Sequence, residues 1–149
     1  MTTTFTTTET TFTPTAVRGI GAGVGLVAAT LTTLFAHDWA EAISMVALIA
    51  VVTGVVYGFA VPRSLQGERP GRPALAYAIV AALLAVPAFW TGLPLVLGVA
   101  AMILGNAGRT ARSGAGASIA ALVIGALASL FYLSIYVMEG IAGNTGFLL

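Results

Sequence analysis

The sequence predicts an all-α integral membrane protein, a helical bundle of about five transmembrane helices. Of its 149 residues, 58% are hydrophobic and 7% are charged, and the mean hydropathy is +1.01. A soluble domain has roughly 25% charged residues. Several apolar runs have the length of about 20 residues that a helix needs to cross a bilayer. All six basic residues are arginines, and five crossings place them on one side of the membrane.

The first two predicted helices cover residues 16–36 and 41–62. Each contains an uncharged run of about the length that a membrane crossing needs. The first run is longer than the roughly 7–15 apolar residues of a signal peptide, and "AHDWA" stands where small cleavage-site residues would be. We therefore expect this run to be a retained span, with a cleaved signal peptide as the alternative.

The uncharged stretch that follows Arg72 is too long for one crossing. It contains "PAFWTGLP" at 87–94, where two prolines flank a Thr-Gly pair. Because proline lacks a backbone donor and glycine permits turn conformations, we predict a reversal there. Helices over 74–90 and 93–108 then form a tight hairpin, or alternatively a re-entrant pair. A fifth helix is predicted over 115–138.

Charge placement orients this bundle. With the N-terminus in the cytoplasm and the C-terminus outside, the inner segments 1–18, 62–73 and 108–114 contain every arginine. This agrees with the positive-inside rule and predicts a multi-pass protein of the cell's inner (plasma) membrane. The arginines expected to fix topology and to meet anionic lipid headgroups of the bilayer are Arg63, Arg69, Arg72, Arg109 and Arg112.

Aromatic residues fit the same arrangement. Trp39 and Trp90 fall at the predicted outer edge, and Tyr57 and Tyr77 fall near the inner edge. Such aromatic belts are typical of the two membrane–water interfaces.

The N-terminus differs in composition from the rest of the chain. Residues 1–15, "MTTTFTTTETTFTPT", include ten threonines. This low-complexity stretch has little to bury, so it predicts a flexible, solvated tail ahead of one transmembrane domain over 16–149. Phosphorylation of the tail, read by a phosphothreonine-binding module, is the alternative.

Small residues recur four positions apart on the predicted helices. The stretch "RGIGAGVG" at 18–25 lacks the G-x-G-x-x-G spacing of a dinucleotide site, and no strand precedes it. It does contain G-x-x-x-G pairs, which let membrane helices approach closely. We expect helix-packing faces at Gly21, Gly25, Gly54, Gly58, Ala121 and Gly125.

No motif predicts catalysis. His37, Asp38 and Glu41 share one turn, but His37 is the sole histidine, and a catalytic zinc site takes three protein ligands. Asp38 followed by Glu41 instead fits a capping box at the start of the second helix. Apart from Arg18 and Glu41 at their ends, the predicted spans contain no Asp, Glu, Lys, Arg or His, which disfavours proton- or sodium-coupled transport.

The glycine-rich loop "GNAGRTARSGAGAS" at 105–118 lacks the lysine and the preceding strand of a phosphate-binding P-loop. A net charge of +1 and the absence of a clustered basic face argue against a nucleic-acid partner. We therefore expect no enzyme activity, no catalytic residue, no metal site and no cofactor.

Residues 93–130 combine an apolar helix ending in Leu-Gly, a short Arg- and Gly-rich loop, and a second apolar helix. The residues that define this module are Leu104, Gly105, Arg109, Arg112, Gly114 and the segment 120–125. In these residues the chain resembles a family of small actinobacterial multi-pass membrane proteins of unknown function. The resemblance implies a multi-pass bacterial membrane protein and carries no catalytic role.

The functional prediction follows from the small-residue faces, the short loops and the missing reactive constellation. We expect an accessory or structural subunit that packs against a larger membrane protein complex. The first alternative is a small passive transporter or channel acting as a homo-oligomer, which needs a polar stripe along a helix. The second alternative is a membrane enzyme, and such an enzyme needs convergent titratable groups at one membrane face.

Overall fold

The computed structural model describes residues 12–34, 36–67, 70–109 and 114–145, with side chains as far as Ala142. Within these residues every element of regular structure is helical, as the sequence predicts. The elements are α1 (Pro14–Leu34), α2 (Trp39–Val55), the π-helix η1 (Val56–Ala60), α3 (Val61–Leu65), α4 (Gly71–Leu84), the 3-10 helix η2 (Phe89–Thr91), α5 (Leu93–Gly108) and α6 (Ala115–Thr145).

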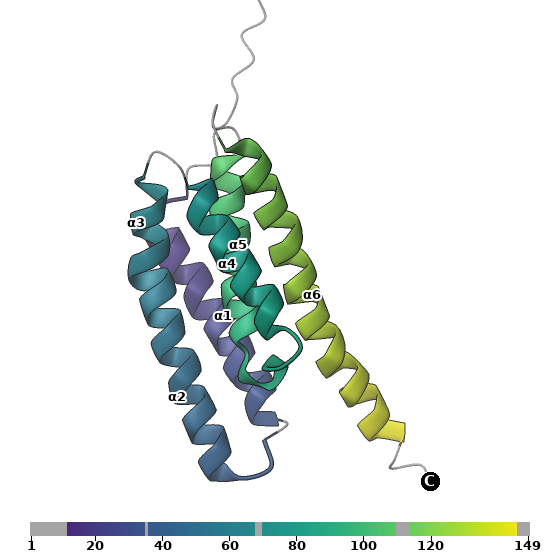
Figure 1. The fold of residues 1–149 in the computed structure, drawn as a ribbon. Coiled ribbons are helices and arrows are strands. Elements are labelled where there is room, and N and C mark those ends of the chain that lie inside the picture. The colour runs from purple at the N-terminus through teal and green to yellow at the C-terminus, as the bar shows by residue number, and fades with distance from the viewer. Residues whose placement is uncertain (1–11, 35, 68–69, 110–113, 146–149) are drawn as a thin grey trace, which may run out of the picture.

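The long helices alternate in direction along one axis (Figure 1). α2, η1 and α3 follow one another without a break and form one helix from Trp39 to Leu65. This helix, α1 and the Ala115–Ala142 part of α6 are each long and apolar enough to cross a membrane, which indicates a membrane protein. α4 and α5 have 14 and 16 residues and fall just below the roughly 17–25 residues of a typical span.

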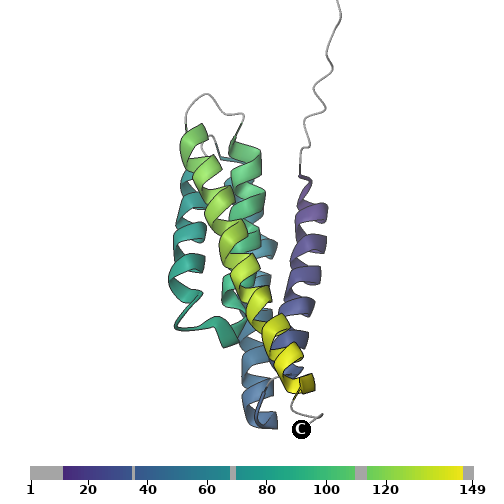
Figure 2. The same cartoon turned by 90° about the vertical axis from the view of Figure 1, so that its right-hand side faces the viewer.

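Charge is segregated between the two ends of the bundle. The starts of α1, α4 and α6 and the ends of α3 and α5 lie together at one end of the bundle (Figures 1 and 2), which we call the arginine end. The described arginines belong to helix ends there: Arg18, Arg63, Arg72 and Arg109. The described acidic residues lie toward the opposite end: Asp38, Glu41 and Glu139.

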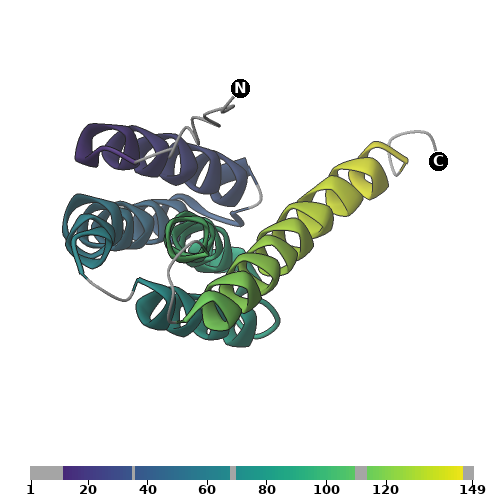
Figure 3. The ribbon, with the colours of Figure 1, turned by 90° about the horizontal axis from the view of Figure 1, so that it is seen from above.

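α5 is the central helix (Figure 3). α4 and α6 pack closely against it, and α1 and α2 approach it from another side. Eleven of its 16 residues are buried, so α5 exposes little surface to lipid. Because its neighbours enclose it, a helix of this length can lie inside a membrane bundle without matching the bilayer thickness itself.

α5 and α6 touch through their backbones. A Cβ atom on Gly125 would lie 2.6 Å from the carbonyl oxygen of Gly98, and one on Gly105 would lie 2.7 Å from the Ser118 carbonyl oxygen. Such contacts are possible only where side chains are absent or small. Of the residues expected to pack, Gly125 lies in this contact, and Ala121, one turn earlier on the same face, is fully buried.

The predicted tight hairpin needs correction. α4 ends at Leu84 rather than at residue 90, because Pro87 disfavours the helical conformation in the residue before it. The reversal takes residues 85–92 and includes η2, so it is longer than the Thr-Gly turn that the sequence predicts. α5 begins and ends where the sequence places it.

Gly92 ends this reversal in a left-handed conformation, with φ of 71°. Glycine adopts this conformation without the steric cost that other residues have. A Cβ here would lie 3.0 Å from Ala28 Cβ and 3.1 Å from Ile49 Cδ1. The reversal therefore closes directly against α1 and α2.

α1 begins inside the predicted tail. The backbone amide of Ala16 donates to Thr13 Oγ1 at 3.2 Å, so Thr13 caps the helix and Pro14 takes a position that favours proline. Phe12 packs against the core. Residues 1–11 lie outside the described residues, and their predicted role as a solvated or phosphorylated tail stays a prediction.

α6 leans away from the bundle toward its C-terminal end (Figure 3). It continues to Thr145 rather than ending near residue 138. Tyr132 and Tyr136 are its last buried side chains, with ring centroids 4.8 Å apart. Beyond them Met138 and Ile141 are more than half exposed, so this part of α6 has an apolar surface that the described chain does not cover.

The α5–α6 contact predicts a clear effect of a single methyl group. We expect Gly125→Ala to lower the free energy of unfolding by about 1–3 kcal/mol, because the added Cβ pushes against the backbone of α5. The measurement is thermal unfolding in mild detergent. Gly140→Ala is the matched control on the same helix, since a Cβ there meets nothing within 4 Å. Equal unfolding midpoints for the two variants would contradict the predicted backbone contact.

Candidate functional site

The candidate site is a groove between α1 and the helix formed by α2 and η1. Its volume is about 450 Å³. Small residues of α2 and η1 line one wall, namely Ala50, Gly54 and Gly58. The α1 wall is formed by Arg18, Gly21, Ala22, Gly25, Leu26 and Ala29. Arg18 is the one charged residue that lines the groove in the described chain. The groove is therefore apolar along its length, with a guanidinium at one end.

At the floor of the groove, α1 contacts α2 and η1 through two glycines. Gly21 lies against Cβ and Cγ of Tyr57, and a Cβ on Gly25 would lie 3.0 Å from Thr53 Cγ2. The Thr53 hydroxyl is buried here without a hydrogen-bond partner in the described chain. Both glycines belong to the predicted packing positions, and both face α2 and η1.

The structure places Gly54 and Gly58 differently from the predicted packing face. Both are exposed, and a Cβ on either would meet nothing within 4 Å. The residues that face α1 are Thr53 and Tyr57, each one position earlier. Because a shift of one residue turns a helical position by about 100°, Gly54 and Gly58 line the open groove instead of a helix contact.

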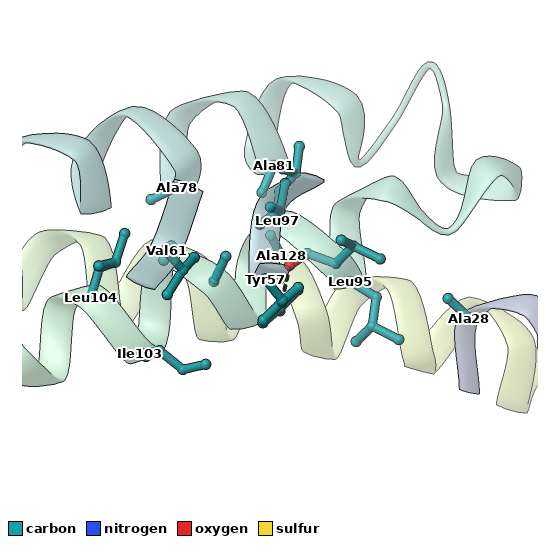
Figure 4. Packing of buried hydrophobic residues seen from close by; sticks show 14 of the residues in the cluster. Ala28, Tyr57, Val61, Ala78, Ala81, Leu95, Leu97, Ile103, Leu104 and Ala128 are labelled. Carbon is teal, nitrogen blue, oxygen red and sulfur yellow. Dashed lines mark hydrogen bonds between the residues drawn. The ribbon is translucent and has the colours of Figure 1, made fainter. Parts of the chain in front are cut away.

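Tyr57 connects this hairpin to the central helix. Its side chain is 2% exposed, and Tyr57 Oη donates to the Val96 carbonyl oxygen at 2.8 Å (Figure 4). The expectation that Tyr57 belongs to an aromatic belt at the membrane edge is therefore wrong. Composition could not reveal this, because a tyrosine suits both an interface and a buried hydrogen bond.

A π-helical turn surrounds Tyr57. The amide of Val61 bonds to the Val56 carbonyl, one residue farther back than in an α-helix. Pro62 follows and has no amide hydrogen, and its ring would collide with the carbonyl of Gly58 in a regular α-helix. The wider turn relieves that collision and is a common way for a helix to adjust near a packed or functional position.

A second hollow continues the groove away from the arginine end. It has a volume of about 370 Å³, shares Val46 and Ala50 with the first, and extends to Trp39 and Thr33. Trp39 lies at the far end of this second hollow and is 81% exposed. No charged residue lines this second hollow in the described chain, so only the first hollow has an electrostatic preference.

The three predicted topology arginines that the structure describes do not cluster into a site. Arg63, Arg72 and Arg109 are exposed on different helix ends, and Arg63 lies 5.6 Å from the ring centre of Phe59. Arg69 and Arg112 lie outside the described residues. The groove instead includes Arg18, which sequence reasoning did not single out. Its position five residues into α1, beside small residues, is the signal that could have identified it.

The polar turn before α2 is a helix cap. The amide of Glu41 donates to Asp38 Oδ1 at 2.7 Å, as the capping-box interpretation predicts. Glu41 Oε2 in return accepts from the His37 amide at 3.1 Å and lies 3.5 Å from His37 Nδ1. These carboxylates are thus engaged with the helix start, and the described residues hold no group of three potential metal ligands.

Removal of the Tyr57 hydroxyl tests the link between the hairpin and α5. We expect Tyr57→Phe to reduce the free energy of unfolding by about 1 kcal/mol, the usual net value of one hydrogen bond. Thermal unfolding in detergent measures this. Tyr77→Phe is the control, because the half-buried Tyr77 hydroxyl has no such partner on α5. An unchanged midpoint for Tyr57→Phe would show that the hydrogen bond contributes nothing.

Comparison with protein-family models, curated proteins and solved structures finds no match for this chain. The resemblance of residues 93–130 to an actinobacterial membrane-protein family therefore stays a prediction.

Proposed function

We propose that the chain crosses the plasma membrane five times, with its N-terminus in the cytoplasm and its C-terminus outside. The segregation of arginines to one end supports this orientation. A hydrogen bond supports a full crossing by α4 and α5, since Thr32 Oγ1 donates to the Trp90 carbonyl at 3.4 Å. Because Thr32 lies in the last turn of α1, the α4–α5 reversal reaches the depth at which α1 ends.

Topology reporters test the five crossings. An alkaline phosphatase fused after Leu149 should be active, and one inserted at Gly67 should be inactive, because phosphatase folds only outside the cytoplasm. A green fluorescent protein at the same two positions should give the opposite pattern. A cytoplasmic signal at Leu149 would overturn the five-span proposal.

We further propose that the protein is an accessory subunit of a larger membrane complex. The observation that carries this proposal is the outer face of α1. Gly19 and Gly23 are four residues apart and exposed, and a Cβ on either would meet nothing within 4 Å. A G-x-x-x-G pair without an internal partner suits close contact with a helix of another subunit.

Passive transport has less support. The buried serine and threonine side chains of α6 and the reversal bond to nearby backbone of their own segments. Ser118 and Ser129 donate to the carbonyls of Gly114 and Gly125 at 3.1 and 2.8 Å, and Thr91 donates to Ala88 at 2.7 Å. Hydroxyls engaged in this way do not offer a continuous polar stripe to a passing solute.

Purification from native membranes in mild detergent tests the accessory-subunit proposal. We expect a second membrane protein to co-elute with the wild type and to be lost, by about tenfold or more, in Gly23→Leu. The added side chain blocks close approach of another helix, and its Cβ meets nothing within 4 Å in the described chain.

Gly116→Leu is the matched control, because a Cβ at Gly116 also meets nothing within 4 Å but lies on α6. Thermal unfolding should be the same for both variants. A wild-type protein that elutes as a monomer without another subunit would contradict the proposal, and so would a complex that is unaffected by Gly23→Leu.

A further inference from the structure

We propose that the groove between α1 and α2 binds one anionic phospholipid, with an acyl chain lying between the helices and the phosphate at Arg18. This inference requires that the bundle lie in a bilayer. It does not depend on the proposed subunit contact, because Gly19 and Gly23 do not line the groove.

The length of the groove matches one leaflet. Its α1 wall runs from Arg18 to Ala29, which corresponds to about 16 Å at 1.5 Å per residue. Half of a hydrocarbon core of roughly 30 Å is about 15 Å. Arg18 belongs to the arginine end of the bundle, so the guanidinium is level with the headgroups when the rest of the groove is level with the acyl chains.

Arg18 gives the groove its preference for an anion. The side chain is exposed. Arg18 forms no salt bridge within the described residues, and no acidic residue lines the groove in the described chain. A guanidinium can bind two phosphate oxygens at once. The charges therefore favour an anionic headgroup over a zwitterionic one.

The volume favours an acyl chain over a transmembrane helix. A helix about 10 Å across takes up roughly 1,200 Å³ over a length of about 16 Å, whereas all the free space between the groove walls, including its open side, is about 880 Å³. The walls also meet at the floor, where Gly21 touches Tyr57. A narrow, flexible hydrocarbon chain can lie within this space, while a helix could enter only partly.

Native mass spectrometry of the full chain tests the proposal. The protein is reconstituted in vesicles of equimolar phosphatidylglycerol and phosphatidylcholine, extracted in mild detergent, and analysed for retained lipid. We expect one phosphatidylglycerol per wild-type chain. Arg18→Gln should lower the affinity about fivefold, the factor that corresponds to the loss of about 1 kcal/mol from one arginine near an anionic surface.

Two further variants separate the groove from general headgroup attraction. Gly54→Phe should remove the retained lipid without changing the unfolding midpoint, because its side chain enters the open groove. Arg72→Gln should retain the lipid, since Arg72 is exposed at the same end but does not line the groove.

Three results would overturn the proposal. One is equal retention of the two lipids, and another is retention that neither Arg18→Gln nor Gly54→Phe reduces. The third is the loss, in Gly54→Phe, of a polypeptide that co-elutes with the wild type from native membranes. That loss would show that a helix fills the groove. Loss of a co-eluting subunit in Gly23→Leu concerns a residue of α1 that does not line the groove, so the two proposals can fail separately.

Discussion

Apolar side chains gain little from leaving lipid for one another, so membrane helices associate through close packing and hydrogen bonds. α5 and α6 meet this constraint at Gly98, Gly105 and Gly125, where a Cβ would lie 2.6–2.7 Å from the backbone of the other helix. The same approach brings Ser118 of α6 beside Gly71 of α4. Three helices thus form a compact group around α5, and the position of every other helix is defined against this group.

The α1–α2 hairpin is attached to that group less tightly. Its polar links are the hydrogen bonds of Tyr57 to Val96 and of Thr32 to Trp90, and Gly92 closes against Ala28 and Ile49. Within the hairpin, Gly21 and Gly25 bring α1 close to Tyr57 and Thr53. The groove follows from this arrangement, because two helices that meet at the floor must diverge at the surface.

The sequence predicts the helices well because composition, run length and cap residues report local physics. Asp38 with Glu41 predicts the start of α2, and the segment 93–108 is α5 itself. The faces are harder to predict. Gly21 and Gly25 have the same spacing as Gly54 and Gly58, yet only the first pair packs internally. Spacing defines a face, whereas the direction of that face depends on neighbours far away in the sequence.

The arginines illustrate the same distinction between composition and position. Arg63, Arg72 and Arg109 lie at helix ends at the edge of the bundle, where each can meet any headgroup. Arg18 shares their charge and their end, but it lies one helical turn inside α1, beside Ala22 and the groove. The proposed lipid site gives Arg18 a second role beside the proposed orientation of the chain, because the groove beside it would confine the acyl chain that carries the headgroup.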